Sequence, residues 1–204
     1  MNKVETVIFD LGNVLIDWNP RYLYRKVFDT EEKVERFLTE VCDMAWNEAQ
    51  DGGRTFEEGN KELFQKFPEY ENEIKLYFER WKEMLGGADD DVVEILKNLR
   101  DNPAYRIYAL TNWSAETFPI AIEQFEFLKW FEGILVSGKE NLKKPDPAIY
   151  ELILKRYQIN PSQAIFIDDS QRNVDAANKF GLPSIRFESA AQLKIALKEI
   201  GVQL

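Results

Sequence analysis

The order of strand-like and helix-like segments is the feature that most limits the folds open to this chain. Residues 4–10 (VETVIFD) form a run rich in β-branched and aromatic residues, as in a buried strand. Similar runs cover residues 105–111, 133–136, 164–168 and 184–187. Helical patterns lie between them, at residues 92–99, 115–125, 147–157, 174–180 and 190–200. This alternation predicts an α/β fold with a doubly wound parallel sheet.

A long block without strand-like runs separates the first strand from the rest. Its apolar residues recur at helical spacing, and Thr55 followed by Glu58 has the sequence of a helix-capping box. Gly86 and Gly87 end the block. We therefore expect a core domain of residues 1–17 and 87–204, with a helical insertion at residues 18–86.

The composition excludes several kinds of chemistry. The chain of 204 residues contains no histidine, so it cannot carry a Ser-His-Asp or Cys-His site or a His-ligated zinc. A general acid or base must therefore be Asp, Glu, Lys, Tyr or Cys.

Charge and cysteine content bear on partners and location. A net charge of −10 disfavours nucleic acid and anionic membranes, so we expect neither as a partner. One cysteine allows no intramolecular disulfide, and the first residues lack the apolar stretch of a signal peptide. These features predict a cytoplasmic protein. A monomer or a homodimer is expected, and the sequence does not choose between them.

Polar side chains stand at the ends of three predicted strands. Asp10 ends the first strand, Thr111 and Asn112 follow the second, and Asp168 and Asp169 end another. Ligands of open α/β sheets bind outside the carboxyl ends of the strands. If these strands are neighbours, their polar ends form one site.

The chemistry of such a site follows from its charges. Carboxylates that lie close together repel and call for a cation, and their oxygens suit Mg²⁺. Lys144, in a lysine pair that precedes Pro145 and a helix, offers a positive charge for a phosphate. A carboxylate such as Asp10 can attack phosphorus and form an aspartyl-phosphate.

Four segments resemble the four motifs of the haloacid dehalogenase-like hydrolase superfamily. They are residues 7–15 (VIFDLGNVL), 109–112 (ALTN), 144–150 (KPDPAIY), and 166–170 (FIDDS) with Asn173, Ala176, Ala177 and Gly181. The insertion resembles the small helical cap that one subgroup carries between motifs one and two. The Asp-Leu-Gly-Asn-Val form of the first motif is similar to a bacterial branch that includes sugar 1-phosphate phosphatases.

This resemblance implies a Rossmann-like core and a set of catalytic residues. Asp10 is then the covalent nucleophile, and the hydroxyl of Thr111 holds the phosphate. Lys144 neutralises the negative charges of the phosphate and of the nucleophile. Asn112 is expected to donate a hydrogen bond to the phosphate.

The resemblance also implies a cofactor and a substrate. Mg²⁺ is then held by Asp10, Asp169, Asp168 and the backbone carbonyl of Gly12. Gly12 and Asn13 of the first loop also contact the substrate, a small phosphorylated metabolite such as a sugar phosphate.

One departure from the family pattern concerns residue 12. Phosphatases of the superfamily usually carry a second Asp two residues after the nucleophile, which protonates the leaving group and then activates water. This chain has Gly12 instead. A leaving group that needs little protonation, such as the anomeric oxygen of a sugar 1-phosphate, accounts for the difference. Asp17 is an alternative donor, although a position at the hinge or at a helix N-cap explains it as well.

Two other readings stay open. Dehalogenases of the superfamily also lack the second Asp and need no metal, but they use a halide-binding arginine for which Arg21 is the candidate near motif one. A phosphate-ligand-binding protein with weak turnover is the second. Trp18 and Trp113 are the tryptophans that we expect near the cleft.

Overall fold

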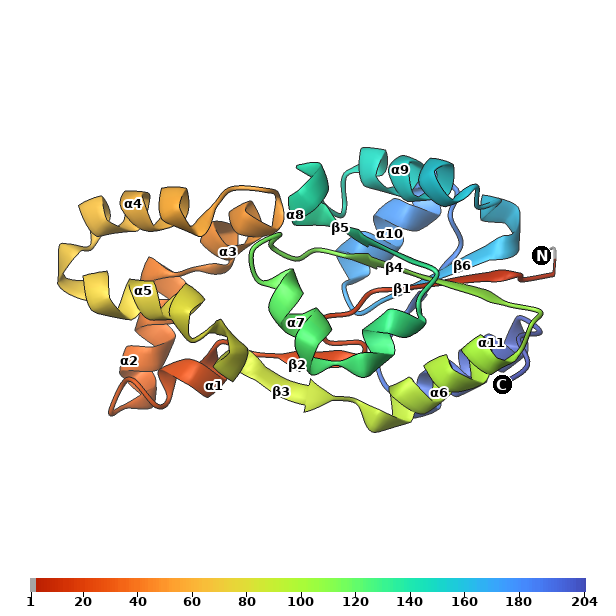
Figure 1. The fold of residues 1–204 in the computed structure, drawn as a ribbon, viewed down its shortest axis with the longest axis horizontal. Helices are drawn as coiled ribbons and strands as arrows, with labels where there is room; N and C mark the ends of the chain where they lie inside the picture. The colour runs from red at the N-terminus through yellow and green to blue at the C-terminus, as the bar shows by residue number, and fades with distance from the viewer. Residues whose placement is uncertain (1–2) are drawn as a thin grey trace.

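The computed structural model describes residues 3–204. Met1 and Asn2, which the sequence analysis assigns to the core segment, lie outside the described residues. Figure 1 shows a sheet with helices on both faces and, beside it, a separate group formed by the helices α1 to α5. No helix in the described part of the chain is long and apolar enough to cross a bilayer.

The sheet has five parallel strands in the order β5-β4-β1-β6-β7. They are β1 (Thr6–Phe9), β4 (Arg106–Thr111), β5 (Gly133–Val136), β6 (Ala164–Asp168) and β7 (Ser184–Arg186). In register, Phe9 of β1 lies opposite Ala109 of β4 and Ile167 of β6. The predicted α/β class with a doubly wound parallel sheet is confirmed, and the first strand of the sequence occupies its centre.

Helices cover both faces of this sheet. They are α6 (Asp90–Asp101), α7 (Phe118–Gln124), α8 (Ser137–Glu140), α9 (Pro147–Tyr157), α10 (Gln171–Phe180) and α11 (Ala190–Glu199). The bounds of α9 are those predicted. By contrast, α7 begins three residues later than predicted, where Pro119 occupies its first turn. The short helix α8 was not predicted.

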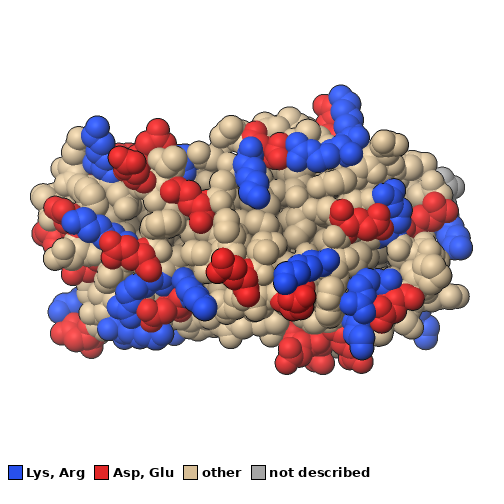
Figure 2. Space-filling model, viewed as in Figure 1, with Lys and Arg blue, Asp and Glu red and all other residues tan. Residues whose placement is uncertain are grey.

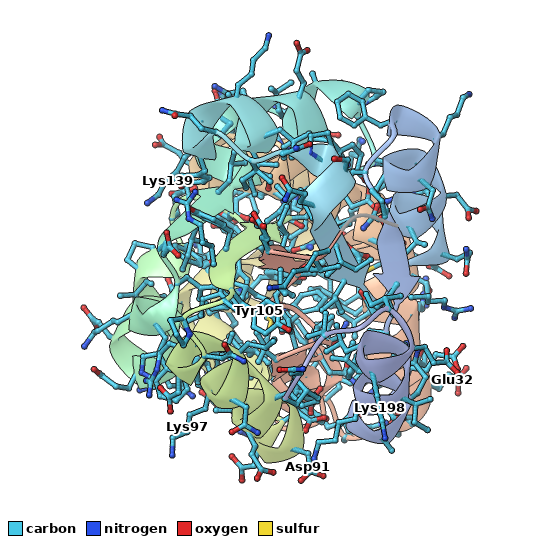
Figure 3. All side chains as sticks on the ribbon, turned by 90° about the vertical axis from the view of Figure 1, so that its right-hand side faces the viewer. Glu32, Asp91, Lys97, Tyr105, Lys139 and Lys198 are labelled. Carbon is cyan, nitrogen blue, oxygen red and sulfur yellow. The ribbon has the colours of Figure 1, made fainter. Side chains whose placement is uncertain are left out.

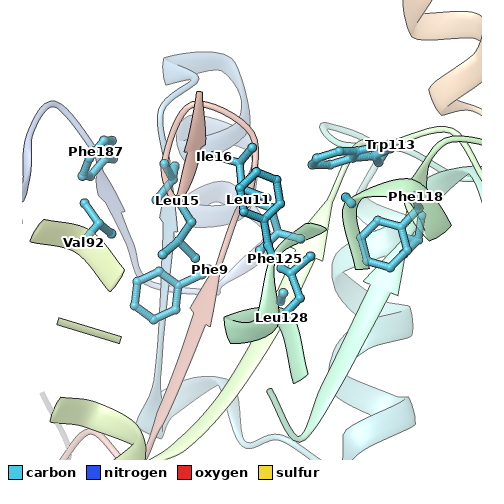
Figure 4. Close-up of a cluster of buried hydrophobic side chains, with 14 of the residues drawn as sticks. Phe9, Leu11, Leu15, Ile16, Val92, Trp113, Phe118, Phe125, Leu128 and Phe187 are labelled. Atoms are coloured by element: carbon cyan, nitrogen blue, oxygen red, sulfur yellow. The ribbon is translucent and has the colours of Figure 1, made fainter. Parts of the chain in front are cut away.

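Alternate residues of the central strand enter two different apolar clusters. Ile8 belongs to a cluster with Ile149, Tyr150 and Phe166 on the α9 and α10 side. Its neighbour Phe9 belongs to the larger cluster on the other face, shown in Figure 4 with the turn that follows β1. Successive side chains of a strand point to opposite faces, so β1 is buried on both.

Most charged side chains lie outside these two layers, whereas Asp10, Lys144 and Asp168 are buried. Figure 3 looks along the long axis of the molecule and shows Lys97 and Lys198 pointing away from α6 and α11 into solvent. Figure 2 shows basic and acidic residues interspersed over the face that it displays.

The inserted segment is helical, as the sequence predicts. Its helices are α1 (Arg21–Tyr24), α2 (Glu31–Arg36), α3 (Met44–Asp51), α4 (Phe56–Lys66) and α5 (Glu71–Glu79). The predicted capping box is present at the start of α4, where the Glu58 backbone N–H donates to Thr55 Oγ1 and Glu58 Oε2 accepts from the Thr55 N–H. Aromatic contacts form its interior, such as Trp46 against Tyr77 with ring centroids 4.9 Å apart.

A two-stranded antiparallel ribbon joins the insertion to the sheet. It consists of β2 (Ile16–Trp18) and β3 (Leu85–Ala88), and Figure 1 shows it between the two parts. Neither strand was predicted from the sequence. The sequence Leu-Gly-Gly-Ala of β3 is too short and too poor in β-branched residues to produce a strand pattern. The ribbon places the entry to the insertion and its exit side by side.

Candidate active site

The carboxyl ends of three neighbouring strands bring the predicted site residues together. Asp10 directly follows β1, Thr111 is the last residue of β4, and Asp168 is the last residue of β6. The central strand β1 lies between the other two. Residues separated by more than 100 positions in sequence therefore meet at one edge of the sheet.

Lys144 is fully buried at the centre of this group. Its Nζ lies 2.9 Å from Asp10 Oδ2 and 2.7 Å from Asp168 Oδ2, and it donates to the carbonyl oxygen of Leu110 at 3.0 Å. Burial by itself lowers the pKa of Lys144, but Asp10 and Asp168 outweigh it, so the net effect is a raised pKa. Lys144 is therefore a fixed positive charge in contact with the carboxylate of Asp10.

Three carboxylates share this region. Asp10, Asp168 and Asp169 each offer an oxygen, and these oxygens lie within 4.8 Å of one another. Burial raises the pKa of Asp10, an effect that Lys144 opposes and Asp168 reinforces. Burial and the charge of Asp168 also raise the pKa of Asp169. One lysine does not balance three carboxylates, and the oxygen donors fit a hard divalent cation such as Mg²⁺.

The two acids of the fourth motif have different surroundings. Asp168 is fully buried, and its oxygens accept from Lys144 Nζ, from the Ser170 N–H at 2.9 Å and from Asn173 Nδ2 at 3.0 Å. Asp169 lines an open pocket together with Asp10. This arrangement suits Asp169 for binding a cation and suits Asp168 for holding Lys144 in place.

The end of β4 supplies a hydroxyl and an amide. Thr111 Oγ1 is buried and has no hydrogen-bond partner among the described residues, which leaves a polar atom available to a ligand. The Asn112 side chain differs from expectation. Its Nδ2 donates to the Lys144 carbonyl at 2.9 Å and its Oδ1 accepts from the Lys144 N–H at 2.8 Å. Asn112 therefore fixes the backbone of Lys144, and it also lines the pocket.

The loop after Asp10 forms one wall of the pocket. Asn13 has a left-handed backbone with φ of 56°, and its Oδ1 accepts from the Trp18 N–H at 3.2 Å. A Cβ added at Gly12 meets no atom within 4 Å. The place that carries a second Asp in the family pattern is therefore open space beside Asp10.

A pocket of about 180 Å³ lies between these strand ends and the helical insertion. The core side is lined by Asp10, Gly12, Asn13, Asn112, Trp113, Ser114, Thr117 and Asp169. The ribbon and the insertion contribute Trp18, Met44, Asn47, Glu48, Asp51, Phe56 and Trp81. Trp18 and Trp113 reach the cleft as expected.

Several residues of the insertion were not identified from the sequence. Asp51 and Asn47 of α3 and Trp81 all line the pocket. Asp51 is the last residue of α3 and is followed by Gly52 and Gly53. An acidic residue directly before a glycine pair was the one sequence feature that could have identified Asp51 as a pocket residue.

Two residues considered from the sequence lie away from the pocket lining. The carboxylate of Asp17 accepts a hydrogen bond from Tyr22 Oη at 2.6 Å, and its strand β2 pairs with β3. Arg21 forms a bidentate ion pair with Glu35, with Nε–Oε1 and Nη2–Oε2 distances of 2.5 and 2.6 Å. The pocket lining within residues 3–204 includes no arginine.

Curated relatives with phosphatase names match most of the chain. A sesquiterpene phosphatase of Aspergillus oryzae is 26% identical over 96% of this chain and 96% of its own length. A phosphorylated carbohydrates phosphatase of Thermotoga maritima is 25% identical over 89% of this chain and 84% of its own.

Solved structures share the fold. A haloacid dehalogenase family enzyme of Bacteroides thetaiotaomicron, solved as a magnesium complex, has a TM-score of 0.72 at 20% identity and covers 95% of this chain and 99% of its own. The L-2-haloacid dehalogenase of Xanthobacter autotrophicus, with chloropropionic acid covalently bound, has a TM-score of 0.67 at 15% identity. The match covers 98% of this chain and 85% of the dehalogenase chain.

The family model described as haloacid dehalogenase-like hydrolase matches residues 4–181, which is most of the chain. The four motifs within that span supply the strand-end residues and the lysine described above. The chain belongs to the haloacid dehalogenase-like hydrolases.

Proposed function

We propose that this hydrolase is a Mg²⁺-dependent phosphatase that acts on small phosphomonoesters through an aspartyl-phosphate on Asp10. The contact between Lys144 Nζ and Asp10 Oδ2 carries the proposal, because Asp10 also lines an open pocket. It places a fixed positive charge beside a carboxylate at the point where a phosphate dianion has to approach. Phosphatase names among relatives that match nearly the whole chain support the same reaction.

In this mechanism each residue of the core has one task. The Asp10 carboxylate attacks phosphorus in line with the leaving group, and Lys144 offsets the charge of the phosphate oxygens. The free hydroxyl of Thr111 donates to a phosphate oxygen. Asn112 holds Lys144 through its backbone, and Asp168 holds it through its ammonium group.

Mg²⁺ would be held by Asp10, Asp169 and the Gly12 carbonyl, and it supplies positive charge that reduces the repulsion between substrate and nucleophile. Asp168 has its oxygens engaged by three donors, so we assign it to the support of Lys144.

We further propose that residues 18–86 act as a cap over the site, with the catalytic core formed by residues 1–17 and 87–204. Three contacts support this division. Glu48 of α3 pairs with Lys143 at 2.6 Å and with Arg172 at 3.1 Å. The Phe56 N–H at the start of α4 donates to Glu116 of the core at 2.7 Å.

The walls of the pocket favour an apolar substrate. Trp18, Trp81, Trp113, Phe56 and Met44 line it. We therefore propose a phosphate ester with an apolar or aromatic organic part, in keeping with the sesquiterpene phosphatase among the relatives. A sugar phosphate is the second candidate because Asn47 and Ser114 also line the pocket and a phosphorylated carbohydrates phosphatase is similar to the chain.

Within residues 3–204 no arginine lines the pocket, and this favours a phosphatase over a dehalogenase. Arg21, the candidate for a halide-binding residue, is committed to Glu35. The structural likeness to a haloacid dehalogenase concerns the fold only.

The test is phosphate release from purified protein with aryl, prenyl and sugar phosphomonoesters, with Mg²⁺ and with EDTA. We expect turnover with Mg²⁺ and its loss in EDTA. Equal turnover in EDTA, or chloride release from 2-chloropropionate without phosphatase activity, would contradict the proposal.

A further inference from the structure

Hydrolysis of an alkyl phosphate requires a group that protonates the leaving alcohol. The family pattern uses a second Asp at position 12, and this chain has Gly12 beside empty space. An alkoxide leaves poorly without a proton, and general acid catalysis typically contributes about 10²–10⁴-fold. For a leaving group that does need a proton, we look for the donor among the acids that line the pocket with Asp10.

Within residues 3–204, four acidic residues line this pocket. Asp10 is the proposed nucleophile, and Asp169 is a proposed cation ligand. Glu48 is paired with Lys143 and Arg172, and although burial raises its pKa, these cations lower it overall. A carboxylate held in its charged form cannot serve as an acid. Asp51 is the one that remains.

Asp51 is fixed to the core although it belongs to the insertion. It is the last residue of α3, and its carbonyl accepts from Ser137 Oγ at 2.5 Å. Its carboxylate accepts from the backbone N–H of Ser114, which lies three residues after Thr111 in the loop that follows β4. Asn47 Nδ2 approaches Asp51 Oδ2 at 3.3 Å. These contacts hold Asp51 in place at the wall of the pocket.

The surroundings of Asp51 raise its pKa into the neutral range. Burial raises the pKa of Asp51 to about 7; Lys143 and Lys144 oppose the rise, and Glu48 adds to it. Among the described residues, no lysine or arginine forms an ion pair with the Asp51 carboxyl group within 4 Å. Lys143 pairs with Glu48 instead, and Lys144 pairs with Asp10 and Asp168. An acid with a pKa close to the working pH is suited to give up a proton and to take one back.

We propose that Asp51, supplied by the helical insertion, is the general acid and base that replaces the missing Asp at position 12. The inference rests on the proposed phosphatase function. In the first step the Asp10 oxygen bonds to phosphorus while the bond from phosphorus to the ester oxygen breaks, and the Asp51 carboxyl gives its proton to that oxygen. In the second step the Asp51 carboxylate takes a proton from water, whose oxygen bonds to phosphorus as the Asp10–phosphorus bond breaks.

The experiment measures kcat/KM for two substrates in wild type and in Asp51→Asn. One is p-nitrophenyl phosphate, whose leaving group needs no proton, and the other is an alkyl phosphomonoester. We expect Asp51→Asn to reduce turnover of the alkyl ester by about 10²-fold or more and that of p-nitrophenyl phosphate by less than about 10-fold. The amide keeps an oxygen for the Ser114 N–H, so the fold is preserved.

A rescue variant sharpens the test. Position 12 has room for a side chain, and the φ of Gly12 lies outside the left-handed region that disfavours other residues. Gly12→Asp in the Asp51→Asn background should restore turnover of the alkyl ester at least about 10-fold. Asp17→Asn is the matched control, because Asp17 is held by Tyr22 away from the pocket lining and should leave the ratio of the two substrates unchanged.

Wild type provides an independent measurement. As the pH rises through 7, the rate with the alkyl ester should fall relative to the rate with p-nitrophenyl phosphate, because only the first requires protonated Asp51. A uniform loss for both substrates in Asp51→Asn, or an unchanged ratio, overturns the assignment. Failure of wild type to release phosphate from either substrate contradicts the proposed function instead.

Discussion

The ammonium group of Lys144 lies 2.9 Å from the carboxylate of Asp10, and neither residue is more than slightly exposed. The two come from segments more than 130 residues apart, and Asp168 closes the group at 2.7 Å. Burial of charge is costly unless each partner is compensated. The site is therefore electrostatically interdependent, and removing one member exposes the others to that cost.

Replacement of Lys144 should cost stability as well as activity. Lys144→Met leaves Asp10 and Asp168 buried without their cation, so we expect the free energy of unfolding to fall by about 3–5 kcal/mol in EDTA. Urea denaturation measures it. Lys143→Met is the matched control: its pair with Glu48 is partly exposed and should cost no more than about 1 kcal/mol. Equal losses of unfolding free energy in the two variants would show that the buried ion pairs of Lys144 stabilise the fold no more than the partly exposed pair of Lys143.

Asp10→Asn should abolish phosphate release while the protein stays folded. The amide cannot form the phosphoryl bond that the carboxylate forms. Far-ultraviolet circular dichroism checks the fold, and mass spectrometry excludes deamidation back to Asp. Suppose that mass spectrometry shows that the variant still carries Asn at position 10. Substantial residual turnover by that protein would contradict the assignment of Asp10 as the nucleophile.

The two acids of the fourth motif should respond differently to Mg²⁺. Asp169→Asn removes a proposed ligand, so the Mg²⁺ concentration for half-maximal activity should rise about 10-fold or more. Asp168→Asn removes a partner of Lys144, so added Mg²⁺ should restore little of the lost activity. Titration of activity with Mg²⁺ in both variants provides the comparison, and identical shifts would contradict the division of roles.

Thr111→Val should separate stability from activity. The hydroxyl of Thr111 is buried without a partner, so its loss should leave the free energy of unfolding unchanged or raise it by about 1–2 kcal/mol. The same change should lower kcat/KM for phosphomonoesters about 10-fold or more because the phosphate loses a donor. A clear loss of stability would indicate that the hydroxyl has a structural partner.

The pKa of Asp51 predicts a pH dependence of stability that needs no substrate. It rises from 3.8 to about 7 on folding, so between these values the folded state binds more protons than the unfolded state. Stability therefore falls as the pH rises through this window. Because Asp51 is partly exposed at the pocket, we expect wild type to lose about 1–2 kcal/mol relative to Asp51→Asn between pH 5 and pH 8. Parallel stability curves for the two proteins would show that the pKa of Asp51 is not raised.

The strand-end residues were predictable because their positions depend on local patterns. Asp10, Thr111 and Asp168 each end a short apolar run, and the carboxyl ends of parallel strands share one edge of the sheet. The long helical pattern between the first two strands likewise predicted an inserted helical segment. The glycine-rich strand β3 has no such pattern, and the ribbon was missed.

The sequence by itself predicted the α/β core and identified Asp10 and Lys144 as members of one site, because strand patterns and strand-end polarity are encoded within a few neighbouring residues. Only the tertiary structure decided that Asp168 supports Lys144 while Asp169 faces the pocket. It also decided that Asp51 of the insertion lines the same pocket as Gly12. The first fact depends on how core segments 24 residues apart in sequence meet, and the second depends on how the insertion packs on the core. No local sequence pattern records either contact.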